Sequence, residues 1–182
     1  MKRLGLGLAL WTVGGCIVPQ EENYINELPV PRNRPPRIVE SHVDPPDRII
    51  RGYGTDLLCE LDFAVVVEDP DTADRLTVSF FVDYNPNQPR GADFVYTVPA
   101  KDNKVIRDER ATYHVRFNSG SLSYLDVPGD HVVEAIVSDT ALVGREPESR
   151  ILRLPDGTIT RDPGYSATYV WFVNTEAGGT CQ

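Results

Sequence analysis

Apolar residues alternate with other residues along two stretches of the chain, and this alternation limits the possible folds more than any other feature. In residues 57–67 (LLCELDFAVVV) and 76–84 (LTVSFFVDY), every second position holds an apolar residue or cysteine. A period of two places those side chains on one face of a half-buried β-strand. The short segment between the two stretches contains Asp69-Pro70, a pair that favours a turn. We therefore expect two consecutive strands that share one core.

The rest of the chain after residue 36 also has β character. No segment has the apolar period of an amphipathic helix of ten or more residues, and no internal repeat is present. Turns rich in Pro, Gly, Asp and Asn separate the remaining strand candidates. About seven short strands in this arrangement predict an all-β protein, with a single antiparallel β-sandwich over residues 37–182. The further strands are expected at 37–41, 93–99, 112–117, 131–139 and 169–174.

The first sixteen residues have the pattern of an export signal. A basic start is followed by an apolar run over residues 4–13, which is too short to cross a bilayer of about 30 Å as a helix. Two glycines then precede Cys16. This pattern resembles the lipobox of bacterial lipoproteins, in which an aliphatic residue and two small residues precede the cysteine that is acylated. The resemblance implies a signal peptide over residues 1–15 and lipidation of Cys16; an ordinary secretory leader with an incidental cysteine is the alternative.

Residues 16–36 are expected to connect the lipid to the folded domain. They are rich in Pro, Asn, Glu and Arg, and they lack apolar periodicity, so they predict an extended tether. Ile17 rather than Asp follows the cysteine. By resemblance to the sorting rule of enterobacterial lipoproteins, this implies the outer membrane, with either the periplasmic or the external face open.

The acidic balance of the chain excludes one class of partner. The formal net charge is -9, and loss of Lys2 and Arg3 with the leader takes it to about -11. A nucleic-acid-binding protein needs a basic patch to neutralise phosphates, and the sequence contains none. An acidic domain also gains nothing from an anionic bilayer, so the acyl chains have to provide the membrane attachment.

Two cysteines remain once Cys16 is acylated. Cys59 and Cys181 can form one intramolecular bridge, remain free thiols, or link two chains. Export to an oxidising compartment favours a bridge.

Three segments together resemble extracellular Ig-like domains of the PKD and cadherin-like kind. They are VEDPDTADRLTVSFFVD at 67–83, PGDHVVEAIVSD at 128–139 and TYVWFV at 168–173. The chain departs from that pattern because Phe80-Phe81 stands where a Trp is usual, and because the last two strands (F and G) are connected by a much longer segment. In such a sandwich the second strand starts at the end where the last strand finishes. The resemblance therefore implies a bridge between Cys59 and Cys181.

The chain contains no recognisable catalytic motif. Its three histidines are scattered, and the sequence lacks a nucleophile elbow, a zinc-binding His pair and a phosphate-binding glycine loop. We therefore expect a protein that is not an enzyme.

The acidic turn after the first strong strand could bind calcium. Calcium takes six to eight oxygen ligands, commonly from loop carboxylates and carbonyls. In an Ig-like sandwich the connection between the last two strands emerges at the same end. The candidate ligands are Glu68, Asp69, Asp71, Asp74 and Asp139. The alternative is a solvated turn whose aspartates bind local backbone.

The long connection over residues 140–168 is the second candidate site. Within it, residues 151–160 predict a small hairpin that turns at Asp156-Gly157. Ordered insertions on a rigid sandwich often carry binding surfaces, although a hairpin can also merely cover a sheet edge. The candidate partner-binding residues are Ile151, Leu152, Arg153, Leu154 and Tyr165.

Taken together, these features predict a membrane-anchored bacterial lipoprotein with a non-catalytic sandwich domain. The expected role is an accessory subunit of an envelope or cell-surface assembly that binds other protein subunits. The alternative is an independent surface adhesin or glycan-binding domain, with calcium as its only candidate cofactor.

Overall fold

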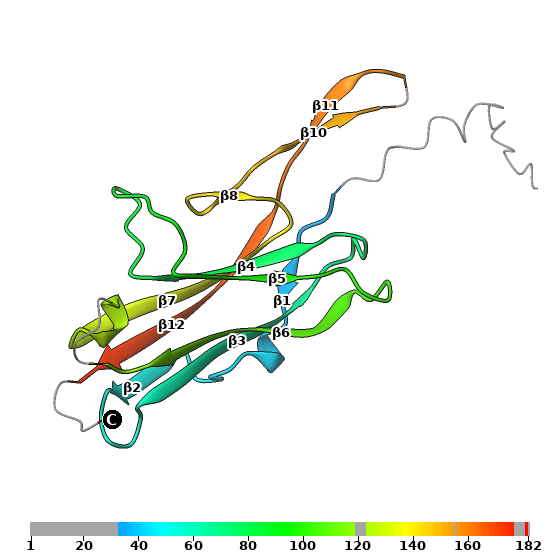
Figure 1. Cartoon of the computed structure of the whole chain (residues 1–182). Coiled ribbons are helices and arrows are strands. Elements are labelled where there is room, and N and C mark those ends of the chain that lie inside the picture. The colour runs from blue at the N-terminus through cyan, green and yellow to red at the C-terminus, as the bar shows by residue number, and fades with distance from the viewer. Residues whose placement is uncertain (1–32, 119–122, 155, 177–180, 182) are drawn as a thin grey trace, which may run out of the picture. The chain divides into compact units, whose positions relative to one another are not determined.

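The computed structural model describes residues 33–118, 123–154, 156–176 and 181 of the 182-residue chain, and these form an all-β domain (Figure 1). The expected signal peptide, Cys16 and most of the expected tether lie outside the described residues. The helical elements of the described part are two 3-10 turns, η1 (Glu40–His42) and η2 (Tyr124–Asp126). No helix in this part is long and apolar enough to cross a membrane. The predicted all-β class is confirmed.

Two sheets share one apolar core. In the three-stranded sheet the order is β1 (Arg37–Ile38), β3 (Glu60–Glu68), β6 (Ile106–Arg116). In the five-stranded sheet the order is β2 (Ile49–Tyr53), β12 (Ser166–Thr175), β7 (Gly129–Ser138), β4 (Leu76–Val82), β5 (Phe94–Val98). This arrangement is consistent with the predicted sandwich.

β2 is the main departure from the predicted topology. It was not expected from the sequence, and it pairs in parallel with β12, with Ile49 beside Phe172 and Ile50 beside Val173. All other neighbouring strands in the two sheets pair antiparallel. The expectation of a purely antiparallel sandwich is therefore wrong at this edge. The short segment IIRGY contains a glycine and an arginine and has no long alternation of its own, so the strand depends on β12 for its pairing.

The core is built by the alternation that the sequence shows. Phe63 and Val65 of β3 and Phe80 of β4 are fully buried, and Trp171 of β12 packs edge-on against Phe63 with ring centroids 5.2 Å apart. The indole nitrogen of Trp171 donates a hydrogen bond to the carbonyl of Pro45 at 2.9 Å. The buried indole therefore has both an aromatic neighbour and a polar partner.

Several expected strand boundaries are wrong. The strand expected at 37–41 ends at Ile38, because Glu40–His42 forms the turn η1. The strand expected from residue 169 begins at Ser166, where β12 pairs with the end of β7. The strand expected from residue 57 begins only at Glu60, because the chain turns over residues 54–57, and Leu57 is 96 % exposed. The strand expected at 112–117 begins at Ile106, so it includes the four charged residues 107–110. Arg107 explains this extension: its side chain is buried, and its guanidinium donates to backbone carbonyls of the turn after β3.

The long connection between β7 and β12 forms two small hairpins. The second hairpin, β10 (Arg150–Arg153) with β11 (Ile159–Asp162), confirms the predicted turn at Asp156-Gly157. In Figure 1 it projects beyond the two sheets. The first hairpin, β8 (Leu142–Val143) with β9 (Glu146–Pro147), was not expected.

The unexpected β8–β9 hairpin lies against the outer face of the five-stranded sheet. Arg145 in its turn forms an ion pair with the nearly buried Glu134 of β7 at 2.8 Å, and it lies over the ring of Tyr84. Phe81 and Ile136, which alternate with core residues, are also buried. Part of this outer face is therefore covered by the chain itself.

The predicted disulfide is confirmed. The sulfur atoms of Cys59 and Cys181 are 2.07 Å apart, with a Cα–Cα distance of 5.5 Å. Cys59 directly precedes β3, whereas the acidic turn follows β3. The bridge and the acidic turn therefore lie at opposite ends of a nine-residue strand that is about 30 Å long.

Candidate functional site

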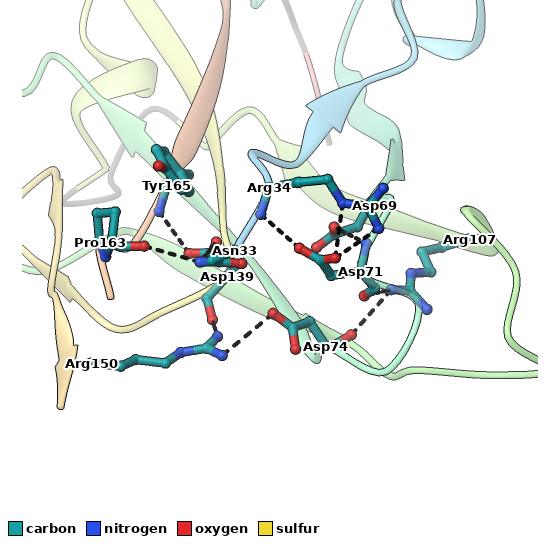
Figure 2. A network of polar contacts seen from close by, with 10 residues as sticks. All are labelled: Asn33, Arg34, Asp69, Asp71, Asp74, Arg107, Asp139, Arg150, Pro163 and Tyr165. Carbon is teal, nitrogen blue, oxygen red and sulfur yellow. Dashed lines mark hydrogen bonds and ion pairs between the residues drawn. The ribbon is translucent and has the colours of Figure 1, made fainter. Parts of the chain in front are cut away.

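The acidic turn belongs to a polar network at the end of the domain opposite the disulfide (Figure 2). Asp69 begins the turn, and its Oδ1 accepts a hydrogen bond from the backbone N–H of Asp71 at 2.7 Å. The buried Arg107 donates to the carbonyls of Asp71, Thr72 and Asp74 at 3.3, 2.9 and 3.2 Å. The turn is thus held by its own aspartate and by an arginine from β6.

The first described residues of the chain bind to this network. Arg34 donates to the carboxylate of Asp71 through its backbone N–H at 2.6 Å and through its guanidinium at 2.8 and 3.0 Å. The side-chain amide of Asn33 donates to Asp139 Oδ2 at 2.6 Å and to the carbonyl of Pro163 at 3.0 Å. Asn33 and Arg34 therefore already belong to the folded domain, although the tether was expected to extend to residue 36.

The network also holds the long connection between β7 and β12. The buried Asp139, at the end of β7, accepts a hydrogen bond from the backbone N–H of Tyr165 at 2.8 Å. Arg150, at the start of β10, donates to the carbonyl of Asp139 and lies 3.4 Å from the carboxylate of Asp74. Figure 2 shows these groups together with Asn33 and Arg34. One set of contacts thus fixes the start of the folded chain and the base of the β10–β11 hairpin.

The five expected calcium ligands do not form one cluster. Among residues 33–118, 123–154, 156–176 and 181, no three His, Cys, Asp or Glu side chains are placed to hold a metal ion. Arg34 binds Asp71, and Arg150 lies between Asp74 and Asp139, whereas Glu68 is the last residue of β3. The structure therefore provides no ligand group for the calcium prediction.

Asp69 is the carboxylate with the most unusual environment. Its side chain is fully buried, and its Oδ2 has no hydrogen-bond partner among the described residues. The pKa of this carboxyl is raised from 3.8 to about 6, mainly by burial and also by the negative charges of Asp71 and Asp74. The backbone N–H of Asp71 and the charge of Arg107 lower the pKa and only partly offset these effects. The pKa shift reflects above all the interior position of the turn.

The five expected partner-binding residues differ in their exposure to solvent. Ile151 and Arg153 are exposed on β10, while Leu152 and Leu154 are half-buried. Tyr165 is half-buried and belongs to the polar network rather than to the hairpin. Ile151 and Arg153 therefore remain as accessible surface, and the other three contribute partly to packing.

A row of apolar side chains on the outer face of the five-stranded sheet was missed. Phe172 of β12 pairs directly with Ile49 of β2 on one side and with Val132 of β7 on the other. Residues paired across strands lie on the same face, and here they line an open groove of about 560 Å³. Ile49 is 62 % exposed and Phe172 is 52 % exposed. We call these three residues the apolar row.

Polar groups surround the apolar row. Asn174 donates to Asp130 at 2.7 Å, and Arg51 and Glu176 also line the groove. The only sequence signal for this site was Phe172, an apolar residue at an outward position between the buried Trp171 and Val173. Without β2, nothing indicated that it had apolar neighbours.

The histidines of the chain have structural or surface positions. His131 is buried, with Nδ1 2.6 Å from Asp83 and Nε2 2.6 Å from the carbonyl of Val127. His114 is exposed and lies 2.6 Å from Asp62. Neither histidine lies beside a nucleophile in these contacts.

Comparisons with known proteins identify no relative. No family model matches the chain, and no similar curated protein or solved structure was found. Functional inference therefore depends on the chain's own surfaces.

Proposed function

We propose that the protein is a lipid-anchored, non-catalytic accessory subunit of a bacterial envelope assembly, and that the groove on its five-stranded sheet binds a partner subunit. The apolar row carries this proposal: Ile49, Val132 and Phe172 are adjacent, and two of them are more than half exposed. Contiguous exposed apolar surface commonly marks a protein interaction site. A domain that acted alone would gain no stability by leaving Phe172 in water.

The surroundings of the apolar row fit a protein interface. Interfaces combine an apolar centre with a polar rim, and aromatic residues are enriched at their centres. Here Phe172 is central, while Arg51, Asp130 and Asn174 form the rim. The β8–β9 hairpin contacts another part of the same sheet face through Arg145 and Glu134.

The lipid anchor is supported by the leader of the chain. A basic start, a short apolar run and Gly-Gly-Cys16 resemble a lipobox, and a chain with a net charge of -9 gains no net electrostatic attraction to an anionic bilayer that would replace an acyl anchor. An Ig-like sandwich is the fold that we propose for the domain, from its sequence segments and its two sheets.

The location of the β10–β11 hairpin favours the role of an accessory subunit over that of an adhesin that binds a distant ligand. An adhesin that used the β10–β11 hairpin would present it away from the cell. The hairpin base is instead bound into the same polar network as Asn33 and Arg34, where the chain arrives from Cys16. The apolar row lies toward the other end of β12 and is better placed to meet a partner.

The proposal is tested by recovering the acylated protein from its native envelope. The variant Ile49→Ser/Phe172→Ser removes the exposed apolar row. Leu57→Ser/Val143→Ser is the matched control, because both of its residues are exposed apolar side chains elsewhere on the domain. We expect the wild type and the control to co-purify with a stoichiometric envelope protein, and the groove variant to lose it while remaining folded.

Equal recovery of that envelope protein with all three forms would contradict the assignment of the groove. Recovery of the wild type without any stoichiometric partner would contradict the accessory-subunit role. Intact mass spectrometry of the same samples tests the acylation of Cys16 separately.

A further inference from the structure

One face of the β10–β11 hairpin combines two isoleucines with two arginines. Ile151 pairs with Arg161, and Arg153 pairs with Ile159. Directly paired residues of an antiparallel hairpin lie on the same face, as do residues two apart in one strand. All four side chains are exposed, with Ile151 at 73 % and Ile159 at 62 %. We call these four residues the Ile/Arg face.

The charge of this hairpin differs from that of the chain. Residues 150–162 contain three arginines and two aspartates, whereas the whole chain has a net charge of -9. The Ile/Arg face contains no carboxylate, and neither of its arginines forms an ion pair with another described residue. It is therefore a small basic and apolar surface on an acidic domain.

The hairpin lies at the end of the domain that the tether reaches. Arg150 at its base binds Asp139, and Asp139 in turn binds Asn33 (Figure 2). Asn33 lies seventeen positions after Cys16 in the sequence. At about 3.5 Å per residue, even a fully extended segment spans no more than about 60 Å. An acyl chain on Cys16 would thus keep this end of the domain close to the bilayer.

We propose that the Ile/Arg face lies on the surface of the membrane that holds the lipid anchor. Ile151 and Ile159 would enter the boundary between headgroups and acyl chains, and Arg153 and Arg161 would bind anionic headgroups. Exposed apolar residues with arginines beside them are the combination that binds a membrane interface. This proposal rests on the proposed lipid anchoring, because four side chains bind weakly unless an anchor raises their effective concentration at the bilayer.

Contact at the hairpin would orient the domain. The tether alone leaves the domain free to rotate, whereas a second contact at the same end fixes that end toward the lipid. The groove, which lies toward the disulfide end, would then face away from the bilayer. The partner subunit is accordingly expected to approach from the side away from the lipid.

The test attaches the mature chain, residues 16–182, to vesicles through Cys16, so that it does not depend on acylation in the cell. Because Cys59 and Cys181 are bridged, Cys16 is the only free thiol and couples to a maleimide lipid. Hydrogen–deuterium exchange of residues 150–162 is measured on vesicles of phosphatidylcholine with phosphatidylglycerol, on vesicles of phosphatidylcholine alone, and without vesicles.

We expect the hairpin amides to be protected on the anionic vesicles and less protected on the neutral ones. Ile151→Ser/Ile159→Ser and Arg153→Glu/Arg161→Glu should each lose the protection, and Ile49→Ser/Phe172→Ser should keep it. Equal exchange with and without vesicles overturns the proposal, and equal protection on both vesicle types overturns the role of the arginines. Absence of acylation in cells would instead overturn the proposed anchoring, and intact mass spectrometry detects it independently.

Discussion

The buried carboxyl of Asp69 should make the stability of the domain depend on pH in a specific way. Burial and the neighbouring aspartates raise its pKa in the folded state to about 6, from 3.8. One pKa unit corresponds to about 1.4 kcal/mol, so the ionised carboxyl lowers the free energy of unfolding by about 3 kcal/mol at neutral pH. This cost is absent below pH 3.8, grows as the pH rises toward 6, and is fully present above 6.

The perturbation that isolates this effect is Asp69→Asn. Asparagine keeps a side-chain oxygen that can accept the hydrogen bond from the backbone N–H of Asp71, but it does not titrate. The free energy of unfolding of both proteins is measured by urea denaturation at several values from about pH 4 to pH 7. All other carboxylates are common to both proteins, so their contributions cancel in the difference.

We expect the free energy of unfolding of the variant, relative to the wild type, to rise by about 2–3 kcal/mol between pH 4 and pH 7. Asp47→Asn, at an exposed position, controls for the loss of one surface carboxylate. A difference between variant and wild type that stays constant over this range would refute the reasoning, because it would show that Asp69 titrates alike in the folded and unfolded states.

Three further changes should affect stability for different reasons. Replacing Cys59 and Cys181 by serine opens a loop of 122 residues and should cost about 5 kcal/mol in urea denaturation; unchanged stability would mean that the bridge constrains little. Trp171→Ala should cost about 3–5 kcal/mol, measured in the same way, because it empties the core and removes an indole hydrogen bond. Arg107→Met should cost about 2–4 kcal/mol because it leaves three half-buried carbonyls of the acidic turn without their donor. The exposed Arg116→Met is its control and should cost less than about 1 kcal/mol, and equal effects of the two arginines would contradict the buried role.

The core strands were predictable because the apolar alternation that indicates each strand lies within the strand's own sequence. The alternation in 57–67 and 76–84 requires one buried face whatever the partner strands are, and Phe63, Val65 and Phe80 are buried as expected. The bridge between Cys59 and Cys181 followed from only two cysteines and a fold resemblance. The β10–β11 hairpin followed from a turn dipeptide between two short strands.

The groove was not predictable because it depends on pairing over a long distance. β2 has no convincing pattern of its own, and it becomes a strand only beside β12, more than one hundred residues later. The buried position of Arg107 was not predictable either, because the carbonyls that accept its hydrogen bonds belong to another loop. The same limit applies to the acidic turn, in which sequence shows the carboxylates but does not show the arginines that bind them.

The two ends of the domain would carry mechanical force differently. A pull on the proposed tether would reach the domain at Asn33 and Arg34, which are held by hydrogen bonds and one ion pair. A partner bound in the groove would hold the domain at β2 and β12, against that pull. The covalent bridge at Cys59 lies beyond the groove, outside the path between these two points. Under tension the anchor-side contacts would therefore rupture first, lengthening the tether while the bridged end of the domain remains folded.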